Sequence, residues 1–183
     1  MHSREFLTDV ASIANALPEE SIEAMASALA ARNGRVYIIG LGGSLANAIH
    51  MAADLRKLCE VDATAFDNIA EITARANDDG LATLYDFWLT QAKNSDILFV
   101  LSVGGGTSEV SPAIVNAVSR FPGKVFGIVG PIGGYTALNS DIVIRVPTNA
   151  NMKWQTPLTE AFQAVIWHCI VSHPVLQKNK TKW

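Results

Sequence analysis

The chain has 183 residues, of which 49% are hydrophobic and 17% charged, enough apolar material for one compact domain with a substantial core. The formal net charge is -3 and the basic residues gather only in the short tail 178–182, which argues against nucleic acid as a direct ligand. No apolar stretch reaches the roughly 18 residues that a membrane span needs, and the N-terminus lacks a secretory pattern. We therefore expect a cytoplasmic protein without a membrane partner, with residues 1–183 as a single domain.

Hydrophobic spacing predicts helices and strands that alternate along most of the chain. Apolar residues recur every three or four positions in the helical segments, whereas the predicted strands are short and almost entirely apolar. Such strands between helices are typical of a parallel sheet buried on both faces, and thus of an α/β fold. In chain order we expect two helices within 1–32, a strand at 35–39, a helix at 44–59, a strand at 61–66, helices within 68–92, a strand at 97–101, a helix at 109–119 capped by Thr107 or Ser108, a strand at 124–129, a short helix at 133–138, a strand at 142–146 and a helix at 156–172.

Two of these strands end in glycines that are followed by hydroxyl side chains. The first continues into Gly40-Leu-Gly-Gly-Ser44 and the second into Ser102-Val-Gly-Gly-Gly-Thr-Ser108. A dinucleotide fingerprint would need glycine where the first loop has Leu45, and neither loop ends in the Gly-Lys-Ser/Thr of a P-loop. Ser44, Ser102, Thr107 and Ser108, with backbone N–H groups at helix starts, can hold a monophosphate. The alternative is that these are ordinary strand-to-helix turns with capping hydroxyls.

Two helices carry ionisable residues that could perform chemistry. In the helix 44–59, His50 and Asp54 stand one turn apart, a spacing at which two side chains can hold one metal or act on one substrate. In the apolar closing helix, Glu160 and His168 would need partners. The alternatives are a solvated polar face for the first pair and a hydrogen-bonded core histidine for His168.

Several motifs together resemble one known family, the sugar isomerase (SIS) domain. The motifs are Gly40-Leu-Gly-Gly-Ser-Leu-Ala-Asn-Ala-Ile-His50 with Asp54, the turn 76–80, the Ser102 loop, Gly133-Gly134 and Arg145-Val-Pro147. Within the family the chain most resembles the phosphoheptose isomerase branch, which converts sedoheptulose 7-phosphate to a heptose 7-phosphate in the making of surface heptose. The resemblance implies a three-layer sandwich around a five-stranded parallel sheet, and a homotetramer with active sites between subunits. Residues 1–32 are then expected to serve in oligomerisation.

The resemblance also assigns a substrate site. The first loop would contribute Gly43 and Ser44, and the phosphate loop would contribute Ser102, Gly104, Gly105, Thr107 and Ser108. Glycines replace some of the family's usual hydroxyls in that loop, so backbone N–H groups would carry more of the phosphate. Leu41 stands where the family has an asparagine, which removes one polar contact. Asp78, in the turn 76–80, would either touch the substrate or cap a helix.

For catalysis, the resemblance implies Asp54 and His168 as the pair that moves protons through an enediol, with Asp54 where the family has glutamate. His50, Asp54, Glu160 and His168 would form a zinc site. The chain has a few more residues than the family between Pro147 and Glu160, and a second alignment of the last helix would place Trp167 at the histidine position. The shorter Asp54 leaves a second interpretation open, a non-catalytic SIS module that binds a phosphosugar or a protein partner.

Overall fold

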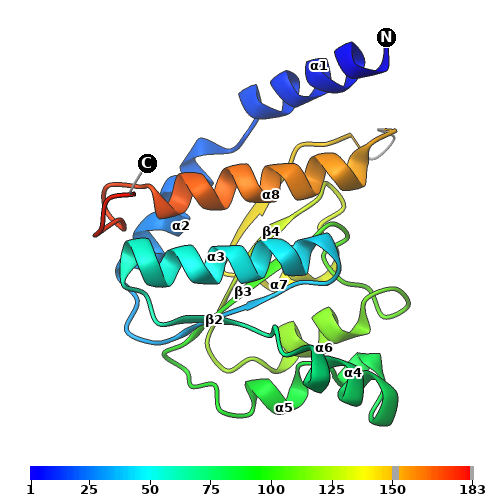
Figure 1. The fold of residues 1–183 in the computed structure, drawn as a ribbon, viewed down its shortest axis with the longest axis vertical. Helices are drawn as coiled ribbons and strands as arrows, with labels where there is room; N and C mark the ends of the chain where they lie inside the picture. The colour runs from blue at the N-terminus through cyan, green and yellow to red at the C-terminus, as the bar shows by residue number, and fades with distance from the viewer. Residues whose placement is uncertain (150–152, 182–183) are drawn as a thin grey trace.

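The computed structural model describes residues 1–149 and 153–181. Within these residues the strands form one five-stranded sheet in the order β2-β1-β3-β4-β5, with every neighbouring pair parallel (Figure 1). The predicted α/β fold with a five-stranded parallel sheet is confirmed. The strands are β1 (Val36–Ile39), β2 (Ala63–Ala65), β3 (Ile97–Ser102), β4 (Lys124–Val129) and β5 (Ile142–Arg145).

Helices cover both faces of the sheet, so the molecule has three layers (Figure 1). The helices α2, α3 and α8 pack on one face, α6 packs on the other, and α1 projects from the body at the N-terminus. No helix of the described residues is both long and apolar enough to cross a membrane. The helices are α1 (His2–Asn15), α2 (Glu19–Ala30), α3 (Gly43–Cys59), α4 (Ile69–Asp78), a 3-10 turn (Leu81–Thr83), α5 (Asp86–Leu89), α6 (Pro112–Arg120), α7 (Gly134–Asn139) and α8 (Gln155–Val171).

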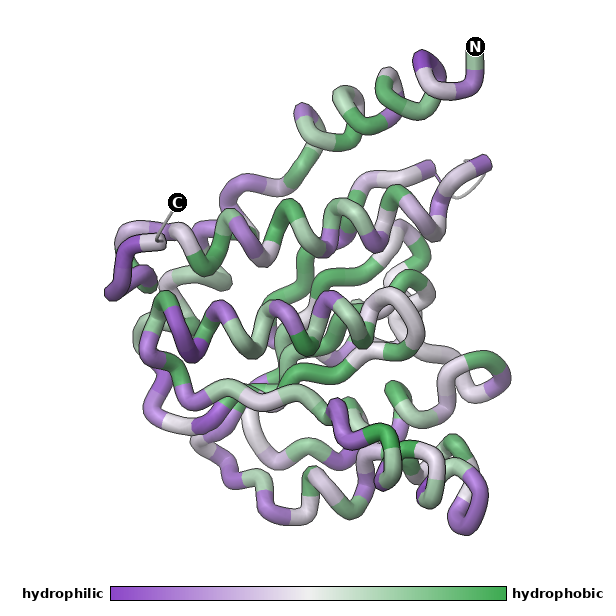
Figure 2. Tube along the Cα trace, viewed as in Figure 1, coloured by the Kyte–Doolittle hydropathy of each residue, from purple (hydrophilic) through white to green (hydrophobic). Residues whose placement is uncertain are grey.

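Two hydrophobic cores, one on each face of the sheet, hold these layers together. Successive residues of a strand point to opposite faces, so neighbouring apolar positions enter different cores. Ile38 and Phe99 join the core under α2, α3 and α8, whereas Ile39 and Leu98 join the core under α6. Figure 2 shows the strands as mostly hydrophobic segments in the middle of the molecule. The near-continuous apolar runs of the sequence therefore follow from burial on both faces.

The strand order creates a switch point between β1 and β3. β1 pairs with β2 on one side and with β3 on the other. The chain then leaves β1 into α3 on one face, and leaves β3 through a loop into α6 on the opposite face. In open parallel sheets such a point leaves a crevice outside the carboxyl ends of the strands, where ligands bind. The two glycine loops meet the sheet at this edge.

The helix after the second glycine loop starts later than predicted. It begins at Pro112, preceded by Ser111 at the cap position, and not at Glu109. Proline is favoured in the first turn of a helix because its missing N–H would have no partner there. No side chain caps α6, so the prediction that Thr107 or Ser108 caps this helix is wrong.

The bounds of the second strand also differ from the prediction, and two predicted segments lie partly outside the residues that the structure describes. The second strand is limited to Ala63–Ala65 instead of 61–66, because it pairs only with β1, over the three positions Val36–Ile38. In the extended loop after Pro147, residues 150–152 lie outside the described part of the chain, as does Lys182 of the basic tail.

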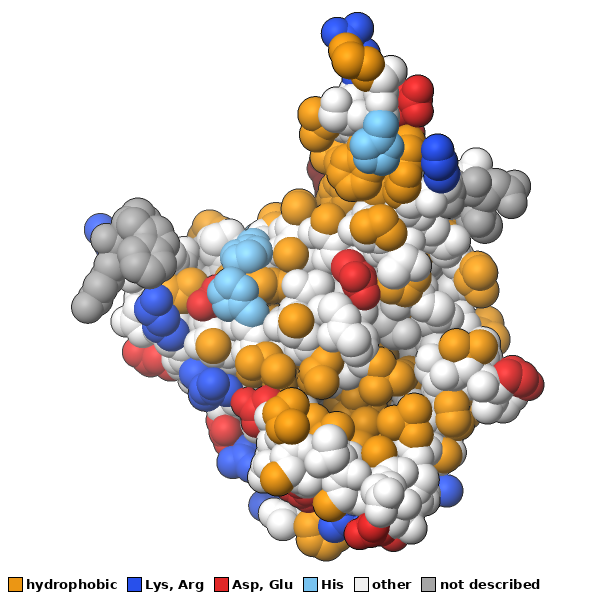
Figure 3. Space-filling model, turned by 45° about the vertical axis from the view of Figure 1, so that its right-hand side comes forward, with side chains coloured by type: hydrophobic (Ala, Val, Ile, Leu, Met, Phe, Trp, Pro, Cys, Tyr) orange, Lys and Arg blue, Asp and Glu red, His pale blue; other side chains and the backbone are white. Residues whose placement is uncertain are grey.

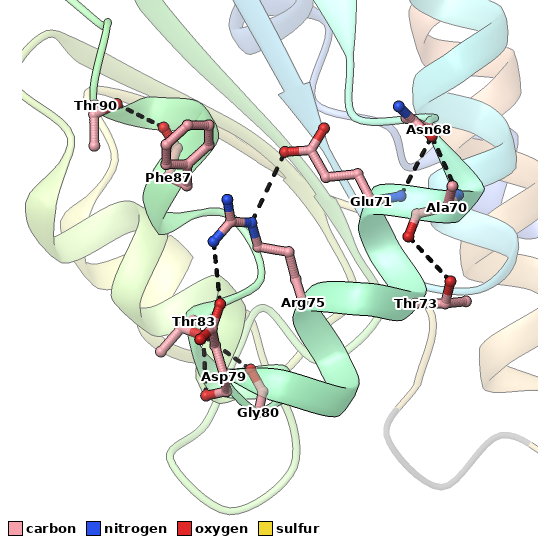
Figure 4. A network of polar contacts seen from close by, with 10 residues as sticks. All are labelled: Asn68, Ala70, Glu71, Thr73, Arg75, Asp79, Gly80, Thr83, Phe87 and Thr90. Carbon is pink, nitrogen blue, oxygen red and sulfur yellow. Dashed lines mark hydrogen bonds and ion pairs between the residues drawn. The ribbon is translucent and has the colours of Figure 1, made fainter.

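A polar network organises the segment that contains Asp78 (Figure 4). Asn68 caps α4 by accepting hydrogen bonds from backbone N–H groups of the first turn. Arg75 then bridges Glu71 and Asp79 at the other end of the helix. Asp78 is the exposed last residue of α4, and its carboxylate accepts a hydrogen bond from the preceding asparagine. Asp78 therefore caps neither α4 nor the 3-10 turn that follows, and its contact with substrate stays a prediction.

Candidate active site

Three of the four predicted metal ligands converge where α3 lies beside α8. The ligand atoms of His50, Asp54 and His168 all lie within 4.8 Å of one another. His50 Nε2 lies 3.6 Å from Asp54 Oδ2. The His50 side chain is 59% exposed and the Asp54 side chain 17% exposed. Figure 3 shows two histidine side chains together on the surface, so this group, called the trio below, opens to solvent.

The ring of His168 is held in a defined orientation. Its Nδ1 lies 2.8 Å from the carbonyl oxygen of Ala164, one turn earlier on α8. A neutral ring that donates from Nδ1 keeps Nε2 as the acceptor, which is the arrangement found in metal-binding and basic histidines. The alternative alignment of the last helix would have placed Trp167 in this role. The structure instead buries Trp167 and brings His168 to His50 and Asp54.

The fourth predicted ligand, Glu160, is not brought to the trio. It precedes His168 by eight residues on α8, which is about 12 Å along a helix axis. Its carboxylate packs instead at the start of α3, where a Cβ placed on Gly43 would come 2.5 Å from Glu160 Oε2. The prediction that one ion is shared by all four side chains is therefore corrected to a group of three, with Glu160 beside the first glycine loop.

A row of polar contacts, called the polar seam below, joins the first glycine loop to the trio. The helices α3 and α8 run side by side in the same direction, so equivalent turns face each other (Figure 1). Asn47 Nδ2 donates to the Glu160 carbonyl oxygen at 2.9 Å and to Gln163 Oε1 at 3.2 Å. Sequence reasoning missed Gln163, although its position three residues after Glu160 on an apolar helix was an available signal.

The first glycine loop brings the backbone close to the start of α3. Gly42 stands at the cap position with φ +59°, a conformation that L side chains rarely adopt, and Ser44 is buried. The Tyr85 hydroxyl donates to the Gly40 carbonyl oxygen at 2.7 Å and anchors the loop from the opposite face. No side chain caps α3. The interpretation of Ser44 as an ordinary capping hydroxyl therefore has no support, since the N–H groups of Leu45 and Ala46 bond the Gly42 carbonyl oxygen and no side chain caps the helix.

The second glycine loop is shaped by packing on the turn before α7. Gly105 has φ +72°, and a Cβ there would overlap the carbonyl oxygen of Gly133. The Thr136 hydroxyl donates to the Gly105 carbonyl oxygen at 2.7 Å, and Ser102 Oγ accepts a hydrogen bond from Gly105 N–H at 3.0 Å. Gly104 differs, because a Cβ there would meet nothing within 4 Å. The loop thus has a packed inner side at Gly105 and an open side at Gly104.

An acidic residue shares the outer part of this loop with the predicted phosphate-binding hydroxyls. The Ser108 hydroxyl donates to the Glu109 carboxylate, and Thr107 Oγ1 accepts a hydrogen bond from the backbone N–H of Val110 at 3.1 Å. The hydrogen bond from Ser108, followed by those from the Glu109 backbone N–H and Thr107, lowers the pKa of Glu109. The loop therefore already directs donors at a negatively charged oxygen pair.

Proteins similar to this chain include phosphoheptose isomerases. That of Rhodospirillum rubrum is 30% identical over 144 residues, which cover 75% of this chain and 73% of the relative. That of Shewanella sediminis is 33% identical over 156 residues, which cover 76% of this chain and 77% of the relative. The solved structure of a phosphoheptose isomerase from Francisella tularensis matches with a TM-score of 0.75 at 24% identity, over 93% of this chain and 92% of that one. No family model matches the sequence.

Sequence likeness and architecture point the same way. The two relatives match over about three quarters of both chains, and the solved structure shares the fold over 93% of this chain. The resemblance drawn from the motifs is thereby confirmed. The chain belongs to the phosphoheptose isomerase family of SIS-domain proteins.

Proposed function

We propose that this protein is an aldose-ketose isomerase that converts sedoheptulose 7-phosphate to a heptose 7-phosphate, within the synthesis of surface heptose. The observation that carries the proposal is the convergence of His50, Asp54 and His168 in a chain whose relatives are named phosphoheptose isomerases. The alternative, a non-catalytic SIS module, is less favoured, because a module that only binds would have no use for side chains that transfer protons.

The substrate would span from the glycine loops to the trio. His50 follows Gly43 by seven residues, which is about 10 Å along α3. The phosphate is assigned to the loop of Ser102, Thr107 and Ser108, where hydroxyls and backbone N–H groups are available. Binding of the phosphate away from the reacting carbons contributes to catalysis because it fixes the orientation of the sugar.

The trio fits a zinc ion. Two imidazoles and one carboxylate are a donor set typical of catalytic zinc, which keeps one position for a water or substrate oxygen. Ligands at about 2.0–2.2 Å in a tetrahedral site lie roughly 3.3–3.6 Å apart. The 3.6 Å between His50 and Asp54 agrees with that spacing, and the other separations in the trio, which reach at most 4.8 Å, would shorten around a bound ion. The Ala164 carbonyl supplies the second contact that zinc-binding histidines usually make. When bound, the ion would polarise the sugar carbonyl and stabilise negative charge on its oxygen.

The protein's own groups account for the proton transfers. Asp54 takes the proton from the hydroxyl-bearing carbon beside the ketone, and the electron pair of that C–H bond forms the double bond of the enediol. In the protein without an ion, His168 Nε2 takes the proton of the neighbouring hydroxyl while the former ketone oxygen gains one, whereas an ion held by His168 would instead stabilise the negative charge on that oxygen. Return of the first proton to the former ketone carbon gives the aldose. No atom is gained or lost, as an isomerisation requires.

We further assign the protein to the cytoplasm and to a homotetramer. The exposure of His50 and His168 supports the assembly, because a neighbouring subunit could close the open side of the trio. The projecting helix α1 carries Leu7 with 64% of its surface exposed, a side chain available for contact between subunits. Size-exclusion chromatography with light scattering tests the assembly, and a mass of about 20 kDa would contradict it.

The activity is tested with purified protein and sedoheptulose 7-phosphate, followed by proton NMR for the aldehyde and hydrated-aldehyde signals. Parallel samples contain a chelator, or the chelator followed by excess Zn²⁺. We expect turnover that falls with the chelator and returns with Zn²⁺. Sedoheptulose without phosphate is the matched control, and its turnover should fall because the anchoring group is missing. Binding of the phosphosugar without product in every sample would exclude the isomerase and favour the non-catalytic module.

A further inference from the structure

Trp167 lies directly under the two histidines of the trio. Its side chain is fully buried, whereas His50 and His168 are exposed. The indole ring stacks on the His168 ring, with centroids 3.5 Å apart and planes inclined by 29°. It also meets the His50 ring edge to face, at 4.7 Å and 67°. One buried ring thus contacts both imidazoles, which come from two different helices.

The stacked contact with His168 is not imposed by the helix. Consecutive residues of an α-helix point about 100° apart, so the His168 ring must turn back to lie on its neighbour. The hydrogen bond between His168 Nδ1 and the Ala164 carbonyl holds the ring from the other side. His168 is therefore fixed between a carbonyl group and the indole face, with Nε2 left free.

Core stability alone does not explain a tryptophan at this position. Within the described part of the chain, the buried indole Nε1 finds no hydrogen-bond acceptor. A buried N–H without a partner costs free energy that a leucine or phenylalanine would avoid. The indole ring makes one stacked and one edge-to-face contact with the two imidazoles. A leucine could make neither contact, and the smaller ring of a phenylalanine would make them less well.

We infer that Trp167 is a positioning residue, a rigid platform that fixes the orientation of the His50 and His168 rings. Exposed histidines otherwise sample several rotamers, and a ligand or catalytic group must be held within roughly 0.5 Å of its productive position. The platform removes that freedom without touching substrate or metal. Its value for isomerisation rests on the proposed function, but its effect on the two rings does not.

The experiment compares Trp167→Leu and Trp167→Phe with a matched control, Phe162→Leu. Phe162 is also a buried aromatic of α8, but within the described part of the chain its ring does not contact the ring of His50 or His168. The first readout is the NMR spectrum of the histidine ring protons in the metal-free protein. We expect Trp167→Leu to shift the His50 and His168 signals, because the ring current of the indole is lost, and to leave His173 unchanged. Phe162→Leu should shift none of them.

The second readout is calorimetric titration with Zn²⁺ alone. Loss of an outer contact to a metal ligand typically weakens affinity about 10- to 100-fold, and we expect that range for Trp167→Leu. Trp167→Phe should recover part of the loss, since a ring face remains. Histidine signals and Zn²⁺ affinity that match Phe162→Leu would overturn the inference. If Trp167→Leu changes the histidine signals and the Zn²⁺ affinity as expected, but the natural protein does not isomerise sedoheptulose 7-phosphate, only the proposed function would be overturned.

Discussion

The two ends of the polar seam are built by different means. At the trio, the proposed function would depend on side chains that project from two long helices, α3 and α8, whose mutual packing fixes their turns. At the glycine loops, it depends on the backbone, which is shaped by close contacts such as that of Gly105 with Gly133. We therefore expect the first end to tolerate few changes of residue type. We expect the second end to tolerate changes of hydroxyl residues but not changes of the backbone path.

This difference explains where the chain can depart from its family without losing the proposed chemistry. The resemblance implies that glycines replace hydroxyl residues in the second loop, yet Ser102 at the end of β3 and the backbone N–H groups of the loop can still provide donors. The Asp54 carboxylate, in contrast, serves both the proposed proton transfer and the proposed zinc site, and it reaches His50 across one turn of α3. Substitutions at the trio should therefore affect turnover, whereas substitutions at the loops should affect stability and phosphate affinity.

The largest effect is expected for His168→Gln. Glutamine keeps a polar side chain of similar size but cannot accept and return a proton at neutral pH, so turnover should fall by about 10²- to 10⁴-fold. Unfolding by urea should change little, because the ring is exposed. The measurement is kcat with sedoheptulose 7-phosphate.

The control for this change is His173→Gln, two residues after the end of α8. His173 pairs with Glu23, away from the trio, through a contact of 2.9 Å. The turnover of the His173→Gln variant should stay close to that of the natural protein. Equal turnover in His168→Gln and the natural protein would contradict the role of His168 and reopen the alternative alignment of the last helix.

The next effect is expected for Gly105→Ala at the second glycine loop. Alanine would have to adopt φ +72° and would overlap the Gly133 carbonyl oxygen, which is backbone and cannot move aside cheaply. The free energy of unfolding in urea should fall by about 1–3 kcal/mol or more. Gly104→Ala is the matched control, because a Cβ at Gly104 meets open space. Equal stability of the two variants would show that the loop does not depend on this packing.

The fold was largely readable from the sequence, for reasons that particular strands illustrate. Ile97–Leu101 is apolar throughout because both faces of β3 are covered, and burial of this kind leaves a clear pattern. The start of α6 was misplaced because Thr107 and Ser108 are good capping residues, while the structure begins the helix at Pro112. The path of the loop before α6 determines where the helix starts, and the capping preferences of single residues do not predict that path.

The site was only partly readable, and Glu160 shows why. Its spacing from His168 was known, but a distance along one helix does not reveal which turn of the neighbouring helix it faces. The parallel packing of α3 and α8 sets Glu160 beside Gly43 and His168 beside His50. The contact of Trp167 with the two histidines could not be predicted for the same reason, since an aromatic residue on an apolar helix does not reveal which side chains lie above it.

A smaller effect is expected for Tyr85→Phe, which removes the anchor of the first loop. The buried hydroxyl donates to the Gly40 carbonyl oxygen, so its loss leaves that oxygen without this donor and should cost about 1–2 kcal/mol of unfolding free energy. Burial raises the pKa of Tyr85 above its ordinary value.

The raised pKa gives a second, pH-dependent check on Tyr85. The unfolded chain releases the tyrosine proton near its ordinary pKa of about 10, whereas the folded protein retains it. The contribution of Tyr85 is therefore fully present below pH 10 and is lost as the pH rises further. The stability of the natural protein should fall more steeply above pH 10 than that of Tyr85→Phe. Parallel pH profiles in urea unfolding would contradict a buried, hydrogen-bonded hydroxyl.

The smallest effect is expected for Glu109→Gln in the second loop. The lowered pKa keeps this carboxylate charged at neutral pH, beside the hydroxyls assigned to the phosphate. Its negative charge and its hold on Ser108 both oppose an incoming phosphate, but the group is exposed, so salt and water screen the repulsion. Glu109→Gln should bind inorganic phosphate about two- to fivefold more tightly at low salt, with the gain shrinking as salt rises. Isothermal titration calorimetry at two salt concentrations measures this phosphate affinity. Removal of a repelling charge can only strengthen phosphate binding. Weaker binding by Glu109→Gln would therefore contradict the prediction and would mean that Glu109 helps to shape the anion site.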